Sequence, residues 1–187
     1  MKIFSEPLPD GYIRLGKKYT MNTDFRTWLK IESVLSDNDI APDIAAMTEL
    51  KLAFRIVPPI DKKLFDFLDW FCRCGEDKKE LSFRSSGNYS SDHDEGYIYA
   101  AFLQQYNIDL AYSEMHWWKY QALFRGLRDT KFNDIMSWRS AVITVDMPRE
   151  QREFLENMQQ LYAVPETLTD AERRERAQNY YRRGVNL

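Results

Sequence analysis

The side chains best suited to chemistry are few and lie far apart in the 187-residue chain. Cys72 and Cys74 are separated by one residue, a spacing that would strain a disulfide bond between them. It also differs from the Cys-x-x-Cys spacing usual in zinc sites, and the chain offers only two histidines, His93 and His116, as nitrogen ligands. We therefore expect reduced, mostly buried thiols and no bound metal.

A polar cluster at residues 92–95 is the next candidate site. Asp92, Asp94 and Glu95 surround His93 and could bind a divalent cation. The same residues fit the start of a helix, where carboxylates are stabilised by free backbone N–H groups, and we interpret Asp92 and Glu95 as a capping box. No serine or cysteine stands in a recognisable nucleophile motif. The sequence predicts a protein that is not an enzyme and needs no cofactor.

Net charge and hydrophobicity argue against nucleic acid and membranes as general partners. The net charge of −3 gives no general attraction to nucleic acid or to an anionic membrane. No apolar run approaches the roughly 20 residues that cross a bilayer, and the first residues lack the apolar region of a signal peptide. We expect a soluble protein in the cytoplasm without membrane contact.

Residues 171–187 depart from this balance, with five arginines against two glutamates. This excess could contact a few phosphates of a nucleic acid. An exposed helix with ion pairs between successive turns explains the same pattern, and we favour that interpretation.

Hydrophobic periodicity predicts a mainly α-helical fold, a compact domain of six to eight helices with a small N-terminal β-hairpin. The hairpin is expected at residues 12–21, around Gly16. A helix at 24–36 follows, and a second begins at Pro42. Asp61 caps a third, which Gly75 ends, and an exposed loop is expected at 76–92. The residues predicted to face the core from these helices are Trp28, Leu29, Ile44, Met47, Leu50, Phe54, Leu64, Phe67, Leu68 and Phe71.

The second half of the chain predicts helices at 97–107 and 113–127, which we place at the centre of the domain. Thr130 caps the next helix, and Pro148 begins another that Pro165 stops. A boundary near residue 166 divides the chain into a helical domain, 1–166, and a basic C-terminal helix or tail, 167–187.

The densest block of large side chains lies within the helix predicted at 113–127. Gln121 and Arg125 fall on a polar stripe, which Trp117 and Trp118 flank, while His116 faces the core side. We expect His116 to be buried and hydrogen-bonded rather than catalytic. Because bulky apolar groups surround most of this helix, its neighbours must come from this chain or from a partner.

This block also carries a resemblance to a known family. The runs at 97–102 (Tyr-Ile-Tyr-Ala-Ala-Phe), 108–110 (Ile-Asp-Leu) and 115–127 (His-Trp-Trp followed by Ala-Leu-Phe-x-Gly-Leu) resemble the bacteriophage gene-product-fifteen family of Gram-positive siphophages and prophages. Residues 24–29 and 162–165 resemble further parts of the pattern, and the resemblance covers roughly residues 8–166. Members of this family are interpreted as tail-assembly proteins because their genes lie beside the tape-measure gene.

The resemblance implies a chaperone that binds the phage tape-measure protein, with other tail assembly proteins as further partners, in the host bacterial cytoplasm. A homo-oligomer of this chain is also compatible with the resemblance. The alternatives are a nucleic-acid-associated phage protein that uses the Arg-rich helix, and a structural tail component retained in the virion. The residues expected to bind the partner are Trp117, Trp118, Gln121, Arg125, Arg173, Arg174, Arg182 and Arg183.

Overall fold

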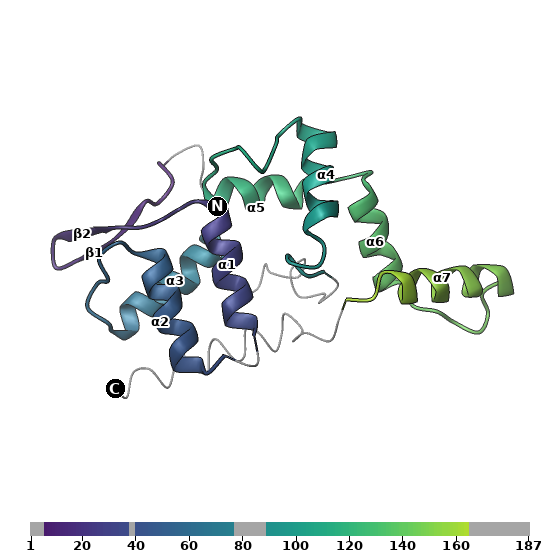
Figure 1. Ribbon diagram of the computed structural model, residues 1–187, viewed down its shortest axis with the longest axis horizontal. Helices are drawn as coiled ribbons and strands as arrows, with labels where there is room; N and C mark the ends of the chain where they lie inside the picture. The colour runs from purple at the N-terminus through teal and green to yellow at the C-terminus, as the bar shows by residue number, and fades with distance from the viewer. Residues whose placement is uncertain (1–5, 38–39, 77–88, 165–187) are drawn as a thin grey trace.

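The structure, a computed structural model, describes residues 6–37, 40–76 and 89–164 (Figure 1). Within these ranges the chain forms one antiparallel hairpin and seven helices, so the predicted mainly α-helical fold with an N-terminal hairpin is confirmed. The elements are β1 (Gly11–Arg14), β2 (Lys17–Thr20), α1 (Phe25–Ser36), α2 (Pro42–Ala53), α3 (Lys62–Cys72), α4 (Glu95–Tyr106), α5 (Trp117–Arg125), α6 (Lys131–Ser140) and α7 (Arg149–Leu161).

Three predictions fall outside the described residues. The loop predicted at 76–92 lies mostly on residues 77–88, and both the boundary near residue 166 and the basic helix at 167–187 lie beyond residue 164. All three stay predictions.

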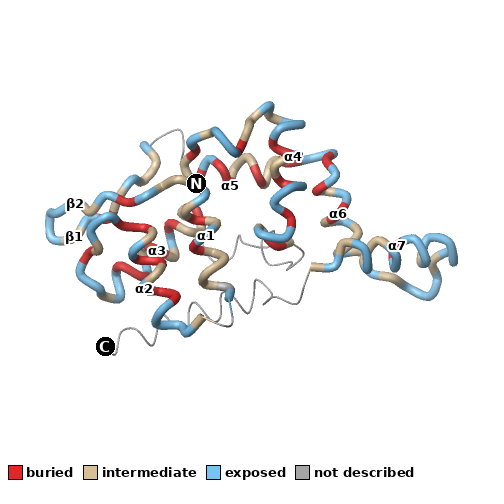
Figure 2. Tube along the Cα trace, in the orientation of Figure 1, coloured by how far each residue is buried: buried red, intermediate tan, exposed pale blue. Residues whose placement is uncertain are grey.

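The helices form an elongated arrangement, with the hairpin at one end and α7 at the other (Figure 1). Helix α1 contacts both α2 and α5, which places it between the first and the second half of the chain. Helix α4 contacts α6, and α6 in turn contacts α7. Burial differs along this arrangement. Figure 2 shows buried segments on α1, α3 and α5, whereas α7 is mostly exposed.

The hairpin predicted at residues 12–21 is confirmed, with its strands at residues 11–14 and 17–20. Gly11 pairs with Thr20 and Arg14 pairs with Lys17, which leaves a two-residue turn at Leu15 and Gly16. Both turn residues have positive φ angles, 50° and 76°. A two-residue turn between right-twisted strands requires this backbone, which glycine adopts without steric cost.

Helix α2 begins at Pro42 as predicted, but it buries a different face. Leu50 is buried as expected, whereas Ile44 is 58% exposed and Met47 is 41% exposed. The buried side chains of α2 are those of Ala45, Ala46, Glu49, Leu50 and Ala53. Alanines allow the close approach of α1 that bulky side chains would prevent, so the prediction that Ile44 and Met47 face the core is wrong.

Helix α5 begins later than the helix predicted at 113–127, because the residues just before α5 pair with the residues just before α1. Asp24 and His116 form an antiparallel bridge, and the backbone N–H of Phe25 donates to the Met115 carbonyl at 2.9 Å. Backbone groups used in this pairing cannot also make helical hydrogen bonds. The chain therefore enters α5 in an extended conformation.

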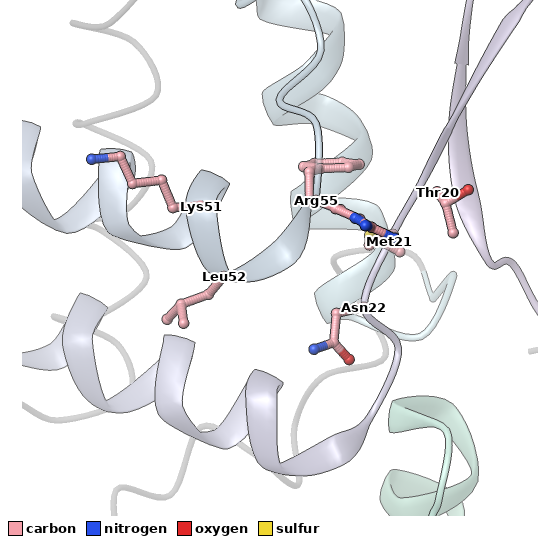
Figure 3. A pocket seen from close by; sticks show the side chains of 7 residues that line it. Thr20, Met21, Asn22, Lys51, Leu52 and Arg55 are labelled. Carbon is pink, nitrogen blue, oxygen red and sulfur yellow. The ribbon is translucent and has the colours of Figure 1, made fainter.

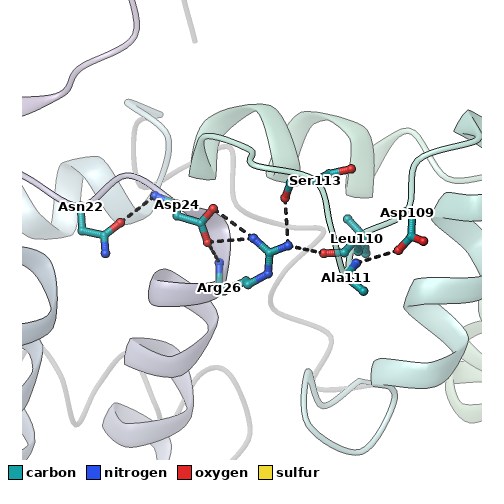
Figure 4. Close-up of polar contacts among 7 residues, drawn as sticks. All are labelled: Asn22, Asp24, Arg26, Asp109, Leu110, Ala111 and Ser113. Atoms are coloured by element: carbon teal, nitrogen blue, oxygen red, sulfur yellow. Dashed lines mark hydrogen bonds and ion pairs between the residues drawn. The ribbon is translucent and has the colours of Figure 1, made fainter.

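Arg26 ties the start of α1 to the loop between α4 and α5 (Figure 4). Its Nη2 donates to the carbonyl oxygens of Leu110, at 2.5 Å, and Ser113, at 2.9 Å, while its Nη1 bonds the carboxylate of Asp24. Hydrogen bonds from a charged donor are stronger than neutral ones. This side chain therefore fixes the loop that delivers the chain to α5.

Aromatic rings fill the space between α1, α3, α4 and α5. Tyr120 stacks between Phe25 and Phe102, with ring centroids 4.7 and 5.2 Å away. Trp28 packs against Phe71 at 4.6 Å and is fully buried. The core thus joins residues from both halves of the chain.

A buried ion pair connects the start of α4 to α6. The guanidinium of Arg139 donates to both carboxylate oxygens of Asp94, at 2.7 and 2.8 Å, and Asp94 is 0% exposed. Asp94 also accepts from the Ser90 N–H at 3.0 Å, and Nε of Arg139 donates to the Tyr162 carbonyl at 2.5 Å. These bonds hold the segment after α7 and the segment before α4 on one side of α6.

Candidate partner-binding surface

Trp117 and Trp118, predicted to bind a partner, lie in the core instead. Trp117 is 0% exposed and Trp118 is 5% exposed. Nε1 of Trp117 donates to the Cys72 carbonyl at 3.1 Å, and Nε1 of Trp118 donates to the Phe71 carbonyl at 2.8 Å. Both acceptors lie in the last turn of α3, and the Phe71 carbonyl also accepts from the backbone N–H of Cys74 at 2.9 Å. The two rings therefore close the end of α3 and present no surface to a partner in this structure.

Gln121 and Arg125 also point inward rather than along an exposed stripe. Gln121 is 2% exposed, and its Oε1 has no hydrogen-bond partner within the described part of the chain. Arg125 is half-buried and forms an ion pair with Glu76. The exposed side of α5 instead carries Lys119. These two residues of the predicted polar stripe are therefore buried or half-buried in the folded chain.

The remaining residues of the predicted site are Arg173, Arg174, Arg182 and Arg183. All four lie outside the described residues, so their part in partner binding stays a prediction.

His116 is half-buried and hydrogen-bonded, and it caps α5 rather than lying within the helix. Its Nδ1 accepts from the backbone N–H of Trp118 at 3.0 Å, so the ring proton must be on Nε2, which donates to the Pro9 carbonyl at 3.0 Å. Burial lowers the pKa of His116, against the opposing effects of the Pro9 carbonyl and Asp10. The neutral imidazole ring of His116 therefore has a structural role, in which it caps α5 and binds the Pro9 carbonyl.

The candidate metal ligands are two cysteines and the polar residues at the start of α4. Cys74 is buried and Cys72 is half-buried, and both thiols are free of disulfide bonds. In the described ranges no group of three or more His, Cys, Asp or Glu side chains could hold a metal ion. The predicted capping box of Asp92 and Glu95 is wrong, because the residue at the start of α4 is Asp94 and its carboxylate binds Arg139.

The outer side of α2 carries the exposed apolar residues that the sequence assigned to the core. Ile44 and Met47 lie there, one turn apart, and Lys51 follows one turn later. Arg55 lies just beyond the end of the helix and is also exposed. We name these four residues the α2 outer face. The face combines apolar groups at one end with two cations at the other.

A pocket of about 420 Å³ adjoins the cationic end of this face (Figure 3). It lies where the end of β2 and the start of α1 meet the end of α2. Backbone pairing fixes its walls, since Met21 and Phe54 form an antiparallel bridge and the Asn22 N–H donates to the Ala53 carbonyl at 2.8 Å. In Figure 3, Arg55 extends toward Met21, and Leu52 points toward α1. The lining residues are Thr20, Met21, Asn22, Lys51, Leu52, Phe54 and Arg55.

One signal in the sequence could have identified this face. The alanines at 45, 46 and 53 repeat with helical spacing, as do Ile44 and Met47, so α2 has two candidate core faces. Small residues at the spacing of a helical stripe indicate close helix packing, and bulkier neighbours then remain outside. The spacing of the large residues alone indicates the side with Ile44 and Met47, which is exposed.

Three comparisons and one property of the helices bear on the class of protein. None of the helices in the described ranges is long and apolar enough to cross a membrane. No curated protein and no solved structure matches the chain. The model of the family described as "Bacteriophage Gp15 protein" matches residues 4–164, which includes every strand and helix described above. The chain belongs to the bacteriophage Gp15 family and is a phage protein.

Proposed function

We propose that this phage protein is a tail assembly chaperone, which binds the tape-measure protein in the host bacterial cytoplasm while the tail tube polymerises. The observation that carries the proposal is the family match over residues 4–164, because the resemblance implies a role in tail assembly. Other tail assembly proteins are the further partners that we propose.

The roles of the titratable side chains support a binding protein rather than an enzyme. His116 caps a helix, Asp94 is held by Arg139, and Arg26 fixes a loop. Groups that are held in this way by structural hydrogen bonds are poorly placed to transfer protons to a substrate. We therefore propose that the protein acts without catalysis and without a cofactor.

Exposed apolar side chains support the same proposal. Phe154 is 49% exposed and Leu161 is 67% exposed on α7, in addition to Ile44 and Met47 on α2. A long amphipathic tape-measure helix would expose an apolar stripe before the tail assembles, and a chaperone needs apolar surface to cover it. Methionine adapts well to partners of varied shape.

Co-expression with the tape-measure protein of the same phage tests the proposal. We expect a several-fold larger soluble fraction of the tape-measure protein in the presence of this chain, and no change for the tail tube protein, which serves as the control client. An unchanged soluble fraction of the tape-measure protein would contradict the proposal.

Mass spectrometry of purified virions separates a chaperone from a structural tail component, because only the latter remains in the finished particle. A chain truncated after residue 166 tests the proposed contribution of Arg173, Arg174, Arg182 and Arg183. Contacts from exposed arginines weaken with salt, so we expect the truncation to reduce solubilisation at low salt only.

A further inference from the structure

The α2 outer face has the composition of a docking surface rather than that of an ordinary solvated helix face. Ile44 and Met47 are 58% and 41% exposed and are followed by exposed Lys51 and Arg55. Ile44, Met47 and Lys51 follow each other at intervals of three or four residues, so they line one side of α2. At 1.5 Å per residue this stretch is about 10 Å long, or roughly two helical turns. The chain leaves the helix at Phe54, whose backbone is extended, and Arg55 follows beside the pocket.

The two cations at the end of this face are available to bind an anion. Among the described residues, neither Lys51 nor Arg55 forms an ion pair or a side-chain hydrogen bond. Arg14, on the hairpin, is by contrast paired with Asp61. Cations near the end of a helix interact favourably with its dipole, but this interaction accounts for neither the exposed apolar residues nor the adjoining pocket.

The pocket beside Arg55 fits an acidic side chain. Its lining includes the buried, apolar side chains of Met21 and Phe54 and the exposed side chain of Thr20. Figure 3 shows the Arg55 side chain reaching across toward Met21 and Thr20, whereas Lys51 points along α2 toward its N-terminal end. The methylene groups of a glutamate would lie on the apolar part of this lining while its carboxylate meets the guanidinium.

We propose that the α2 outer face docks an amphipathic, acidic helix of a partner protein. The apolar residues of that helix pack on Ile44 and Met47, and a carboxylate one to two turns further along enters the pocket at Arg55. Nucleic acid fits this face less well, because two of its four residues are apolar and the whole chain carries a net charge of −3. The proposal deepens the proposed function and rests on it for the identity of the partner as the tape-measure protein.

A synthetic peptide tests the surface independently of the partner's identity. The probe is a fluorescent helical peptide of about 14 residues, roughly four turns, with leucine on one face and glutamate on the other. Its control replaces every glutamate by lysine. We expect the full-length protein to bind the acidic peptide at least tenfold more tightly than the basic one at low salt, as measured by fluorescence anisotropy.

Matched variants assign the binding to this face. Met47→Glu and Arg55→Glu should each weaken binding of the acidic peptide about tenfold or more. Their controls are Val145→Glu, at a residue that is 91% exposed, and Lys63→Glu, which makes the same charge change on the exposed side of α3. All four positions are at the surface, and thermal unfolding will show whether each variant keeps the stability of the wild-type protein.

The two proposals can fail separately. Equal binding of both peptides, no binding of the acidic peptide, or equal losses in the test and control variants would overturn the docking surface. The same variants are then measured with the tape-measure protein. If the wild-type chain binds the acidic peptide through this face but leaves the tape-measure protein insoluble, the proposed function fails and the surface stands.

Discussion

Nε1 of Trp118 donates a hydrogen bond to the carbonyl oxygen of Phe71 at 2.8 Å, which joins the first turn of α5 to the last turn of α3. Trp117 makes the equivalent bond to Cys72, the next residue of α3. Because both rings are buried, these bonds contribute in a site that water does not reach. The pair of indoles thus acts as a C-terminal cap supplied by another helix.

We expect Trp117→Phe and Trp118→Phe each to lower the free energy of unfolding by about 1–3 kcal/mol, because phenylalanine fills much of the space but donates no hydrogen bond. Trp→Ala at either position should cost about 3–5 kcal/mol. Trp70→Phe is the control, since Trp70 is 38% exposed. Urea unfolding measures these differences, and equal losses at all three positions would show that the bonds contribute little.

The buried pair of Asp94 and Arg139 gives a second prediction. Arg139→Met should lower the free energy of unfolding by about 3–5 kcal/mol, because it leaves the carboxylate of Asp94 buried without its counter-ion. Adding Asp94→Ala should recover part of the loss, so the two effects will not add.

Arg149→Met is the control for this experiment, because Arg149 and Glu153 form an exposed pair on α7 with side chains 84% and 54% exposed. Such a pair should contribute less than about 1 kcal/mol. Additive losses at Asp94 and Arg139 would contradict the prediction.

His116 predicts a pH dependence of stability. Burial lowers the pKa of its ring in the folded protein, so the unfolded chain binds more protons as the pH falls through the ordinary value of 6.5. The contribution of His116 is therefore fully present above that value and is lost as the pH falls toward the lowered pKa. Protonation also places a proton on Nδ1, which removes the acceptor for the Trp118 N–H.

His116→Asn is the matched variant, because the asparagine oxygen can accept the same N–H but does not titrate. Thermal unfolding between about pH 5 and pH 8 should show a weaker pH dependence in the variant than in the wild-type protein, over the range in which histidine titrates. An identical dependence in both proteins would assign the effect to other groups.

Arg26 predicts a local effect on the loop before α5. Arg26→Lys keeps the charge, but a single ammonium group cannot reproduce the planar contacts to Leu110 and Ser113. We expect a loss of about 1–3 kcal/mol in the free energy of unfolding. Amide exchange in residues 108–115 should also become faster. Arg128→Lys, at an exposed position, should change neither quantity.

The sequence by itself determined the elements and many of their ends. Pro42 begins α2, Asp61 caps α3 by accepting from the Leu64 N–H at 2.9 Å, and Thr130 forms a capping box at α6. The backbone of Asn107 has the left-handed conformation, φ 51°, that ends α4. These signals act within one helical turn, so a reader of the sequence can identify them without knowing the fold. The family pattern is likewise present in the sequence.

Only the tertiary structure decided which side of a helix is buried. Helices α2 and α5 carry apolar residues around most of their circumference, so periodicity allows more than one core face. Contact with α1 selected the alanines of α2 and left Ile44 and Met47 outside. Contact with the end of α3 buried Trp117 and Trp118, whose indole N–H groups donate to the Cys72 and Phe71 carbonyls. Both choices depend on a neighbour that is distant in the sequence, and local periodicity carries no information about such a neighbour.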